Sequence, residues 1–349
     1  MRQLTFVEAK RFEWRDVPPP VIETDKDAIV EPIAVARCDL DYYIAIGAYG
    51  RPGPYAFGHE MVAVVREIGD RVTSVVPGDR VIVPFQINCG ECANCRRGWT
   101  NACAAVPSAA SYGLGTGVER DFGGGFSDLL RVPFADAMLV PLPESIAPET
   151  ACLLSDNVAD GYRTVAAHLA RFPGAPVLVA GGLAQSVGLY AAQAALALGA
   201  ERVVYADNDD ARLALARAAG VEALKVDYAA TRRHDDTFLI TVDASSLAEG
   251  TAYAFRSTAP CGFCTGVSGG LGAMTPLPLA GSWIRGITYE VSRVHSRATL
   301  THVLGHVCDG ALHPEKLTAR AALFEDAIEA MFDPAPKIVF SKKCEPEKI

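Results

Sequence analysis

The segment at residues 89–103, CGECANCRRGWTNAC, places four cysteines at positions 89, 92, 95 and 103. Turns between them can bring the four sulfur atoms to one point, and a closed structural zinc site takes four thiolates in a tetrahedron. Disulfides are not expected in a large chain without an export signal. The common iron–sulfur spacing ends with a shorter gap and a proline, where this chain has Ala104. The spacing therefore predicts a structural zinc on Cys89, Cys92, Cys95 and Cys103.

A second set of potential metal ligands lies earlier in the chain. Gly58-His59-Glu60 follows a turn-rich stretch, and Cys38 lies 21 residues before His59. Cysteine, histidine and carboxylate are zinc ligands, and a catalytic site keeps one position open for water or substrate. On residue types alone the set is ambiguous, because an isolated cysteine is often a small core residue and a histidine near a turn often faces solvent.

The composition excludes several classes of function. The chain has 349 residues, is 50% hydrophobic and carries a net charge of −9, values that suit a soluble protein of two domains. No basic stretch stands out, so nucleic acid is not an expected partner. No apolar run is long enough to span a bilayer, and the first residues do not resemble a signal peptide. The other cysteines are scattered, so we expect a reducing cytoplasm, with Cys261 and Cys264 as buried thiols.

The elements that must position these residues change in character along the chain. Up to about residue 145, short apolar runs alternate with glycine and proline turns and predict strands. A glycine- and serine-rich stretch at 107–125 predicts a loop. The predicted strands are 28–33, 61–68, 80–84, 129–132 and 137–141.

Beyond Pro148, apolar strands alternate with amphipathic helices, which predicts a parallel sheet covered on both faces. The predicted strands are 177–180, 202–206, 223–226, 238–242, 262–267 and 287–291, and the helices are 186–198 and 210–219. Helices at 299–309 and 324–332 and a strand at 337–340 follow. The fold class is therefore α/β.

The first strand–helix turn of this region is a candidate dinucleotide site. The fingerprint G-x-G-x-x-G holds a pyrophosphate on backbone amides and a helix N-terminus. With Gly188 as the third glycine, the first two positions fall on Leu183 and Gln185, so the motif is degenerate and could be an ordinary turn. Asp207 follows 19 residues later, where an acidic residue binds the ribose of NAD and repels the phosphate of NADP. The candidate cofactor loop comprises Gly182, Leu183, Ala184, Gln185, Ser186, Val187 and Gly188.

The order of these features resembles the zinc-dependent medium-chain alcohol dehydrogenase family over essentially the whole chain. The matching segments are Cys38, Gly58-His59-Glu60, VPGDRVIVPF at 76–85, the four clustered cysteines, SDNVADGY at 155–162 and DNDDARLALARAAG at 207–220. The resemblance implies two zinc ions per chain. It also implies an oxidoreductase in which zinc polarises an alcohol or carbonyl oxygen while hydride passes to or from NAD.

The resemblance assigns roles residue by residue. Cys38, His59 and Asp156 match the catalytic zinc ligands, and Glu60 matches a glutamate that exchanges with the zinc-bound water. Asp41 matches an aspartate that hydrogen-bonds the zinc-bound histidine. Arg212 matches a basic residue at the cofactor ribose, and Lys337 lies near a basic residue that binds the pyrophosphate in some members.

One departure concerns proton transfer. Two residues after the zinc cysteine the family usually has serine or threonine, whose hydroxyl relays the proton, and this chain has Leu40. Leucine has no exchangeable proton. Tyr43 lies where some members place a relay histidine, and Tyr42, Tyr43, Asp39 or a water could take over the relay. The loss of the hydroxyl leaves open two alternatives: a reductase of conjugated carbonyls or iminiums, or a non-catalytic, dehydrogenase-like binding protein.

The resemblance also implies an architecture. A GroES-like β-rich catalytic domain should comprise residues 1–147 and 292–349, with the cysteine lobe at 89–103. A Rossmann domain should span residues 148–291, and catalytic zinc and nicotinamide should meet between the two domains. Residues 262–291 resemble the edge of the Rossmann sheet through which family members dimerise, so a homodimer or homotetramer is expected.

Overall fold

The computed structural model of the chain describes residues 1–115, 121–267 and 274–342. It divides into two compact units. Unit 1 contains residues 1–156, 295–304 and the chain from 318 onward, and unit 2 contains residues 157–294 and 305–317. Parts of the predicted loop at 107–125 and of the predicted dimerisation segment at 262–291 lie outside the described residues.

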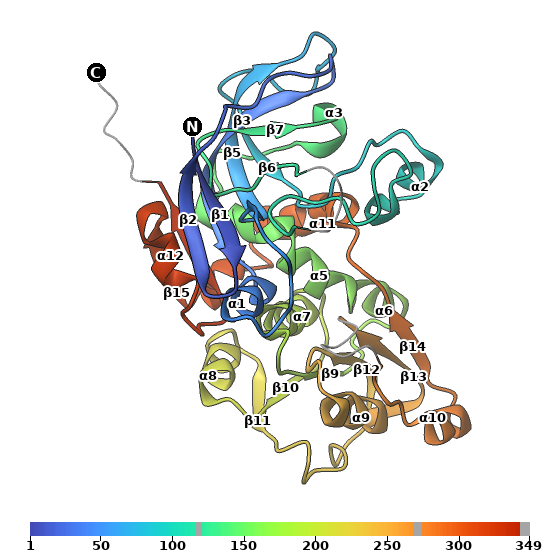
Figure 1. Cartoon of the computed structure of the whole chain (residues 1–349). Coiled ribbons are helices and arrows are strands. Elements are labelled where there is room, and N and C mark those ends of the chain that lie inside the picture. The colour runs from blue at the N-terminus through green and yellow to red at the C-terminus, as the bar shows by residue number, and fades with distance from the viewer. Residues whose placement is uncertain (116–120, 268–273, 343–349) are drawn as a thin grey trace. The chain divides into compact units, whose positions relative to one another are not determined.

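Unit 1 is built on two sheets, one three-stranded and one seven-stranded (Figure 1). The larger has the order β15-β16-β3-β5-β6-β8, with β7 also paired to β3. Its central pairs, β16–β3, β3–β5 and β5–β6, are antiparallel. The strands of unit 1 are β1 (Arg2–Glu8), β2 (Arg11–Asp16), β3 (Ala28–Arg37), β4 (Tyr55–Ala56), β5 (Glu60–Ile68), β6 (Arg80–Val83), β7 (Leu130–Val132), β8 (Val140–Pro141), β15 (Arg320–Leu323) and β16 (Ile338–Ser341).

The helices of unit 1 are short. They are α1 (Asp39–Ile46), α2 (Ala93–Arg96), α3 (Ala135–Met138), α4 (Pro148–Ala151) and α12 (Ala327–Ala330), with the 3₁₀ helices η1 (Thr100–Ala102), η2 (Cys152–Ser155) and η4 (Phe324–Asp326). The amino-terminal part of α11 (Ser296–Cys308) also belongs to this unit. α4 and η2 pack on β3 and β5, so the boundary of unit 1 lies after Asp156, whereas the sequence places it near residue 148.

Unit 2 contains a six-stranded, wholly parallel sheet in the order β11-β10-β9-β12-β13-β14. This is the doubly wound order in which the chain starts at the centre and reverses direction once. The α/β prediction is therefore confirmed. The strands are β9 (Val177–Ala180), β10 (Val203–Asp207), β11 (Glu222–Lys225), β12 (Phe238–Asp243), β13 (Thr258–Gly266) and β14 (Thr288–Val291).

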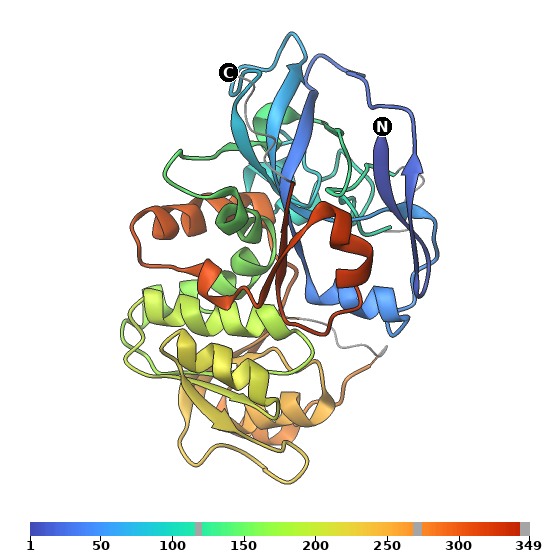
Figure 2. The same ribbon diagram turned by 90° about the vertical axis from the view of Figure 1, so that its left-hand side faces the viewer.

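Helices cover both faces of this sheet, with α7 and α9 on opposite sides of β9 and β12 in Figure 1 and the turned view of Figure 2. β9 is buried along its length, as expected for a strand covered on both faces. The helices of unit 2 are α5 (Asn157–Arg163), α6 (Ala166–Arg171), α7 (Gln185–Ala197), α8 (Asp210–Ala218), α9 (Ala248–Ser257) and α10 (Leu279–Arg285), with the 3₁₀ helix η3 (Pro314–Leu317).

Tertiary contacts override the sequence pattern at residues 137–141. The pattern predicts one strand there, but α3 runs to Met138 before β8 begins. The reason lies in Asp136, whose carboxylate accepts hydrogen bonds from the backbone and hydroxyl groups of Thr73 and Ser74. This contact holds the segment in a helical turn, where local alternation alone indicates an extended chain.

Candidate zinc and nucleotide sites

The antiparallel pair β3–β5 brings Cys38 and His59 together. β3 ends at Arg37 and β5 begins at Glu60, and Ala36 pairs with Glu60 in the register. Cys38 directly follows β3 and His59 directly precedes β5. Because the two strands are antiparallel, both residues lie at the same end of this strand pair. Both are buried, with exposures of 8% and 1%.

Gly58 makes the approach to β5 possible. Its φ of +92° lies in the region that favours glycine. A Cβ atom at this position would also lie 2.6 Å from the ring of Phe126. The glycine before His59 is therefore required by the backbone turn and by the close packing of Phe126.

α1 supplies Asp41, which contacts both ligand residues. Cys38 is the N-cap of α1, and its backbone N–H donates to Asp41 Oδ2 at 2.9 Å. Asp41 Oδ1 lies 3.4 Å from His59 Nδ1. A carboxylate in this position favours the tautomer that leaves Nε2 available as a ligand. The two atoms lie within ion-pair distance but do not form a hydrogen bond, so the hydrogen bond that the resemblance assigns to Asp41 stays a prediction.

Asp156 completes the cluster. It lies between η2 and α5, and its Oδ2 is 3.3 Å from His59 Nε2. Cys38, His59, Glu60 and Asp156 each place one ligand atom within 4.8 Å of the others, and all four residues are buried. The structure therefore brings together the four residues of the predicted catalytic metal site, although Asp156 is 97 residues from His59.

The charge balance of this cluster favours a cation. Burial raises the pKa of the Cys38 thiol to about 12 and that of Glu60 to about 8. Burial alone would lower the pKa of His59, but Asp41 and Asp156 outweigh it and raise this pKa well above its ordinary value. Burial thus disfavours the charged forms of Cys38 and Glu60, while the carboxylates around His59 favour a positive charge at its ring. A divalent cation would supply positive charge and would deprotonate the thiol. Sulfur, imidazole and carboxylate donors fit zinc.

Glu60 forms a fully buried ion pair with Lys337. The Lys337 ammonium lies 2.6 and 2.7 Å from the two carboxylate oxygens of Glu60, and neither side chain is exposed. β16 and β5 flank β3 on either side, which brings these two residues to the same edge of the sheet. The sequence suggests a pyrophosphate contact for Lys337, and in the structure its ammonium group holds Glu60. The residues are 277 positions apart, and no local pattern signals the pair.

The substitution Lys337→Met is expected to lower the free energy of unfolding by about 3–5 kcal/mol, because Glu60 would stay buried without its counter-ion. Urea denaturation measures the loss, and the double variant Glu60→Gln/Lys337→Met should recover part of it. Lys342→Met is the matched control, since Lys342 pairs with Glu31 at a partly exposed site and should contribute less than about 1 kcal/mol. Equal losses in the two single variants would refute this reading.

The four clustered cysteines also converge. Their sulfur atoms lie within 4.8 Å of one another. Backbone N–H groups point at three of these sulfurs: Cys92 N to Cys89 at 3.3 Å, Cys95 N and Ala104 N to Cys92 at 3.5 and 3.4 Å, and Cys89 N and Ala105 N to Cys103 at 3.3 and 3.4 Å. These amide donors lower the pKa of Cys92 to about 6. Such donors stabilise thiolates, which are the ligands of a closed zinc site.

In unit 2 the candidate nucleotide loop joins β9 to α7. Gly188 packs where a third glycine is expected, because a Cβ atom there would lie 2.8 Å from Ala244 Cβ. The amides of Leu183 and Ala184 donate to the carbonyl oxygens of Ser245 and Ala244 at 2.9 and 3.1 Å. This part of the loop is therefore fastened to the residues that follow β12.

Asp207 ends β10, as a ribose-binding carboxylate should. It is fully buried and accepts hydrogen bonds from Tyr205 Oη at 2.9 Å and from Arg212 Nε and Nη2 at 2.8 and 2.7 Å. Arg212 thus holds the carboxylate in place. The pairing joins two residues that the sequence assigns separately to the cofactor ribose.

Residues 24–144 match the family model described as "Alcohol dehydrogenase GroES-like domain". The medium chain reductase/dehydrogenase ucsI of Acremonium sp. is 34% identical over 231 residues, which cover 64% of this chain and 75% of that protein. The chain belongs to the zinc-type medium-chain alcohol dehydrogenase family. The predicted fold class, with its GroES-like and Rossmann parts, is confirmed.

Other family members give the extent of the match. The alcohol dehydrogenase TADH from Thermus sp. ATN1 superimposes with a TM-score of 0.87 at 27% identity, covering 98% of this chain and all of that chain. The uncharacterised zinc-type alcohol dehydrogenase-like protein AdhB of Bacillus subtilis is 32% identical over 219 residues. The alignment covers 61% of this chain and 57% of AdhB, so the chain spans little more than half the length of that relative.

Leu40, which replaces the family's relay hydroxyl, lies in the first turn of α1 and is partly buried. Tyr43 lies on the same helix and is also partly buried, with its ring 5.5 Å from that of Tyr42. Asp39, beside Leu40, is buried at 5% exposure. The side-chain hydroxyl groups that α1 carries are those of Tyr42 and Tyr43, two and three residues after Leu40.

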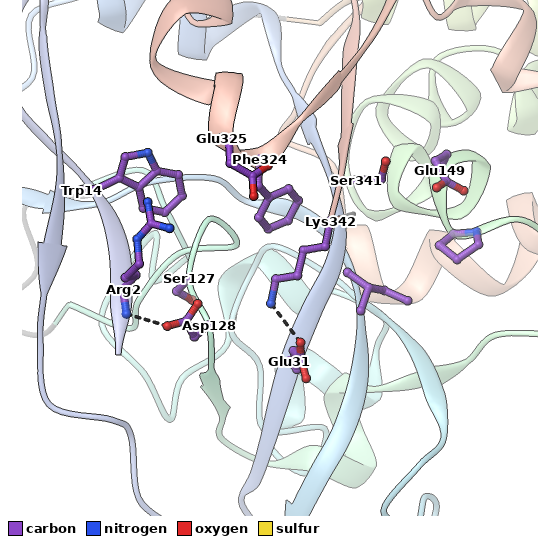
Figure 3. A pocket seen from close by; sticks show the side chains of 12 residues that line it. Arg2, Trp14, Glu31, Ser127, Asp128, Glu149, Phe324, Glu325, Ser341 and Lys342 are labelled. Carbon is purple, nitrogen blue, oxygen red and sulfur yellow. Dashed lines mark hydrogen bonds and ion pairs between the residues drawn. The ribbon is translucent and has the colours of Figure 1, made fainter. Parts of the chain in front are cut away.

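The cavity shown in Figure 3 is separate from the cluster of Cys38, His59, Glu60 and Asp156. Its volume is about 680 Å³, and it lies in unit 1. It is lined by Arg2, Trp14, Glu31, Ile33, Ser127, Asp128, Pro148, Glu149, Phe324, Glu325, Ser341 and Lys342. None of the metal ligands borders it, so it is not the candidate active site.

Among the residues that the structure describes, no helix is long and apolar enough to cross a membrane.

Proposed function

We propose that this protein is a zinc-dependent oxidoreductase that transfers hydride between an alcohol, or its aldehyde or ketone, and NAD. The observation that carries the proposal is the buried convergence of Cys38, His59, Glu60 and Asp156. Family membership supports the same chemistry. Zinc held there would supply positive charge to a substrate oxygen.

The protein's own residues divide this work. Cys38, His59 and Asp156 would hold the metal, and Asp41 would fix the imidazole of His59. Glu60 would stand beside the metal as an exchanging or fourth ligand, and Lys337 holds its carboxylate by two hydrogen bonds. The second zinc would brace the lobe at residues 89–103, giving two zinc ions per chain. Tyr43 is our candidate for moving the proton, since Leu40 cannot.

We propose NAD as the cofactor, with NADP disfavoured by Asp207. The variant Asp207→Ser removes the buried carboxylate that accepts two hydrogen bonds from Arg212 and leaves this guanidinium only its 3.9 Å ion pair with Asp209, so it should attract a 2′-phosphate. The ratio of kcat/KM for NAD to that for NADP is expected to fall by about 10- to 100-fold, the worth of one or two charge-assisted hydrogen bonds. Asp210→Asn is the control, because Asp210 is 78% exposed on the same helix as Arg212. An unchanged ratio in Asp207→Ser would contradict the assignment.

Oligomerisation and location follow from other features. Trp283 and Ile284 of α10 and Val291 of β14 are 83%, 76% and 57% exposed. We propose that this apolar edge of unit 2 forms a homodimer or homotetramer, which sedimentation equilibrium tests. None of the nine cysteines within the described residues forms a disulfide, and on this basis we propose a cytoplasmic location. Cys261 is exposed, whereas the sequence suggests that it is buried like Cys264.

Turnover across a substrate panel tests the proposed function. Primary alcohols, secondary alcohols and polyols with NAD are compared with enals and imines with NADH. Turnover of an alcohol supports the proposal. Turnover of enals or imines alone favours the conjugate reductase, for which Leu40 is the supporting observation. Absence of NADH binding at millimolar concentration, followed by intrinsic fluorescence, would exclude both enzymes and leave the non-catalytic binding protein.

A further inference from the structure

The segment that carries Asp156 is held by a residue 141 positions away in the sequence. Ser296 is the first residue of α11, and its hydroxyl donates a hydrogen bond to the backbone carbonyl of Ser155. Ser155 is the last residue of η2 and directly precedes Asp156. Ser296 and Ser155 are both fully buried, so water does not replace this contact.

The bonded carbonyl determines where Asp156 lies. The last carbonyl groups of a helix have no partner within the helix, and burial makes an external donor necessary. The carbonyl of Ser155 belongs to the peptide plane that joins Ser155 to Asp156. Its hydrogen bond therefore fixes the orientation of that plane and, with it, the direction in which Asp156 leaves the backbone.

Ser296 is itself anchored to Gln86, whose neighbour Phe85 packs against His59. Its backbone N–H donates to Gln86 Oε1 at 3.1 Å, and Gln86 is 2% exposed. Gln86 follows Phe85, whose ring centre lies 5.6 Å from that of His59. Ser296 thus connects two segments beside the cluster. One is the backbone that carries Asp156, and the other is the Phe85–Gln86 segment, whose Phe85 ring packs against His59.

The residues on either side of Ser296 fasten the start of α11 to unit 1. His295 Nδ1 accepts a hydrogen bond from the Asn101 amide at 3.4 Å, and Arg297 Nε donates to the carbonyl of Ala137 at 2.8 Å. Asn101 lies in the cysteine lobe, between Cys95 and Cys103. The Ser296 hydroxyl, which donates to Ser155, therefore lies in a segment whose three residues 295–297 each form a hydrogen bond to another part of unit 1.

We propose that Ser296 is a positioning residue for the catalytic metal site, acting through Ser155 to hold Asp156 in its liganding position. This inference rests on the proposed function, because it assumes that Asp156 binds zinc. Residues that orient metal ligands through one hydrogen bond typically contribute 10- to 100-fold in metal affinity. The Ser296 hydroxyl should therefore raise the zinc affinity of the catalytic site by a comparable factor and should not change the zinc affinity of the cysteine lobe.

The test is a metal titration of the full chain carrying Ser296→Ala. The catalytic site is emptied and titrated with Co²⁺, whose absorption spectrum reports ligand geometry, and then with Zn²⁺ in competition. The expected result is a 10- to 100-fold weaker affinity and an altered Co²⁺ spectrum, with the lobe zinc retained. Ser296→Thr keeps the hydroxyl and should bind Co²⁺ and Zn²⁺ at the catalytic site more tightly than Ser296→Ala does. Ser282→Ala is the matched control, since the buried Ser282 also donates to a backbone carbonyl, but in α10 of unit 2.

The outcomes separate this inference from the proposed function. If the unaltered chain binds no second metal ion, the proposed function fails and Ser296 has no site to position. If the unaltered chain binds it and Ser296→Ala binds it within twofold, the role of Ser296 is refuted while the zinc site stands. If Ser296→Ala does not fold, Gln86→Ala, which removes the acceptor of the Ser296 amide, is judged by the same twofold criterion.

Discussion

Replacing His59 by alanine is expected to abolish turnover, with kcat/KM reduced by at least about 10³-fold, and to lower the zinc content from two ions per chain to one. The imidazole contacts Asp41 on one side and Asp156 on the other, so it is the centre of the ligand cluster. A metal ion at a reacting oxygen contributes several kcal/mol to the rate, and each 1.36 kcal/mol corresponds to a factor of ten. Steady-state kinetics and elemental analysis measure the two effects.

The matched control is His302→Ala, because His302 is exposed on α11. It should retain activity and both zinc ions. The His59 account would be refuted if His59→Ala lost activity while keeping two zinc ions. It would equally be refuted if the variant kept more than about a tenth of the activity, since a third ligand cannot be dispensed with at a catalytic zinc.

Replacing Cys103 by serine is expected to release the lobe zinc and to lower the free energy of unfolding by about 3–5 kcal/mol, at the upper end of single substitutions. Cys103 accepts two backbone N–H groups within the lobe, so the metal and these amides stabilise the same turns. A structural zinc contributes its binding free energy to folding. Denaturant unfolding with zinc analysis measures both quantities.

Cys308→Ser is the control for the lobe, because Cys308 is exposed on α11 and outside both cysteine and metal clusters. It should change the unfolding free energy by less than about 0.5 kcal/mol. Loss of the catalytic zinc together with the lobe zinc in Cys103→Ser would contradict the assignment of two separate sites. Retention of full stability after loss of the lobe zinc would contradict a bracing role.

The sequence predicts the sheet of unit 2 well because its strands are buried on both faces and separated by helices. The run Val177–Ala180 is predicted and observed with the same bounds. By contrast, α1, α9 and α10 are not predicted. Glycine interrupts the apolar periodicity of α9 and α10, and α1 is only eight residues long. In such segments, tertiary packing decides the helix and local propensity does not.

The two sets of metal ligands differ in how the sequence predicts them. The four cysteines of the lobe lie within residues 89–103, so their spacing alone predicts a metal site. Cys38, His59 and Asp156 lie far apart, so only the family resemblance joined them before the structure. The contacts that orient these ligands could not be predicted. The pairing of Lys337 with Glu60 and that of Ser296 with Ser155 depend on the order of strands and on where α11 starts, and neither leaves a trace in spacing or periodicity.

The central claim is that the buried cluster of Cys38, His59, Glu60 and Asp156 is a catalytic zinc site, and one measurement addresses it directly. Alcohol oxidation with NAD is followed while a chelator removes the more labile zinc ion and stoichiometric zinc is then restored. The account predicts that activity disappears with the loss of one zinc ion per chain, while the lobe zinc and the fold are retained, and that it returns on reconstitution. Undiminished activity in protein that retains only the lobe zinc would contradict it.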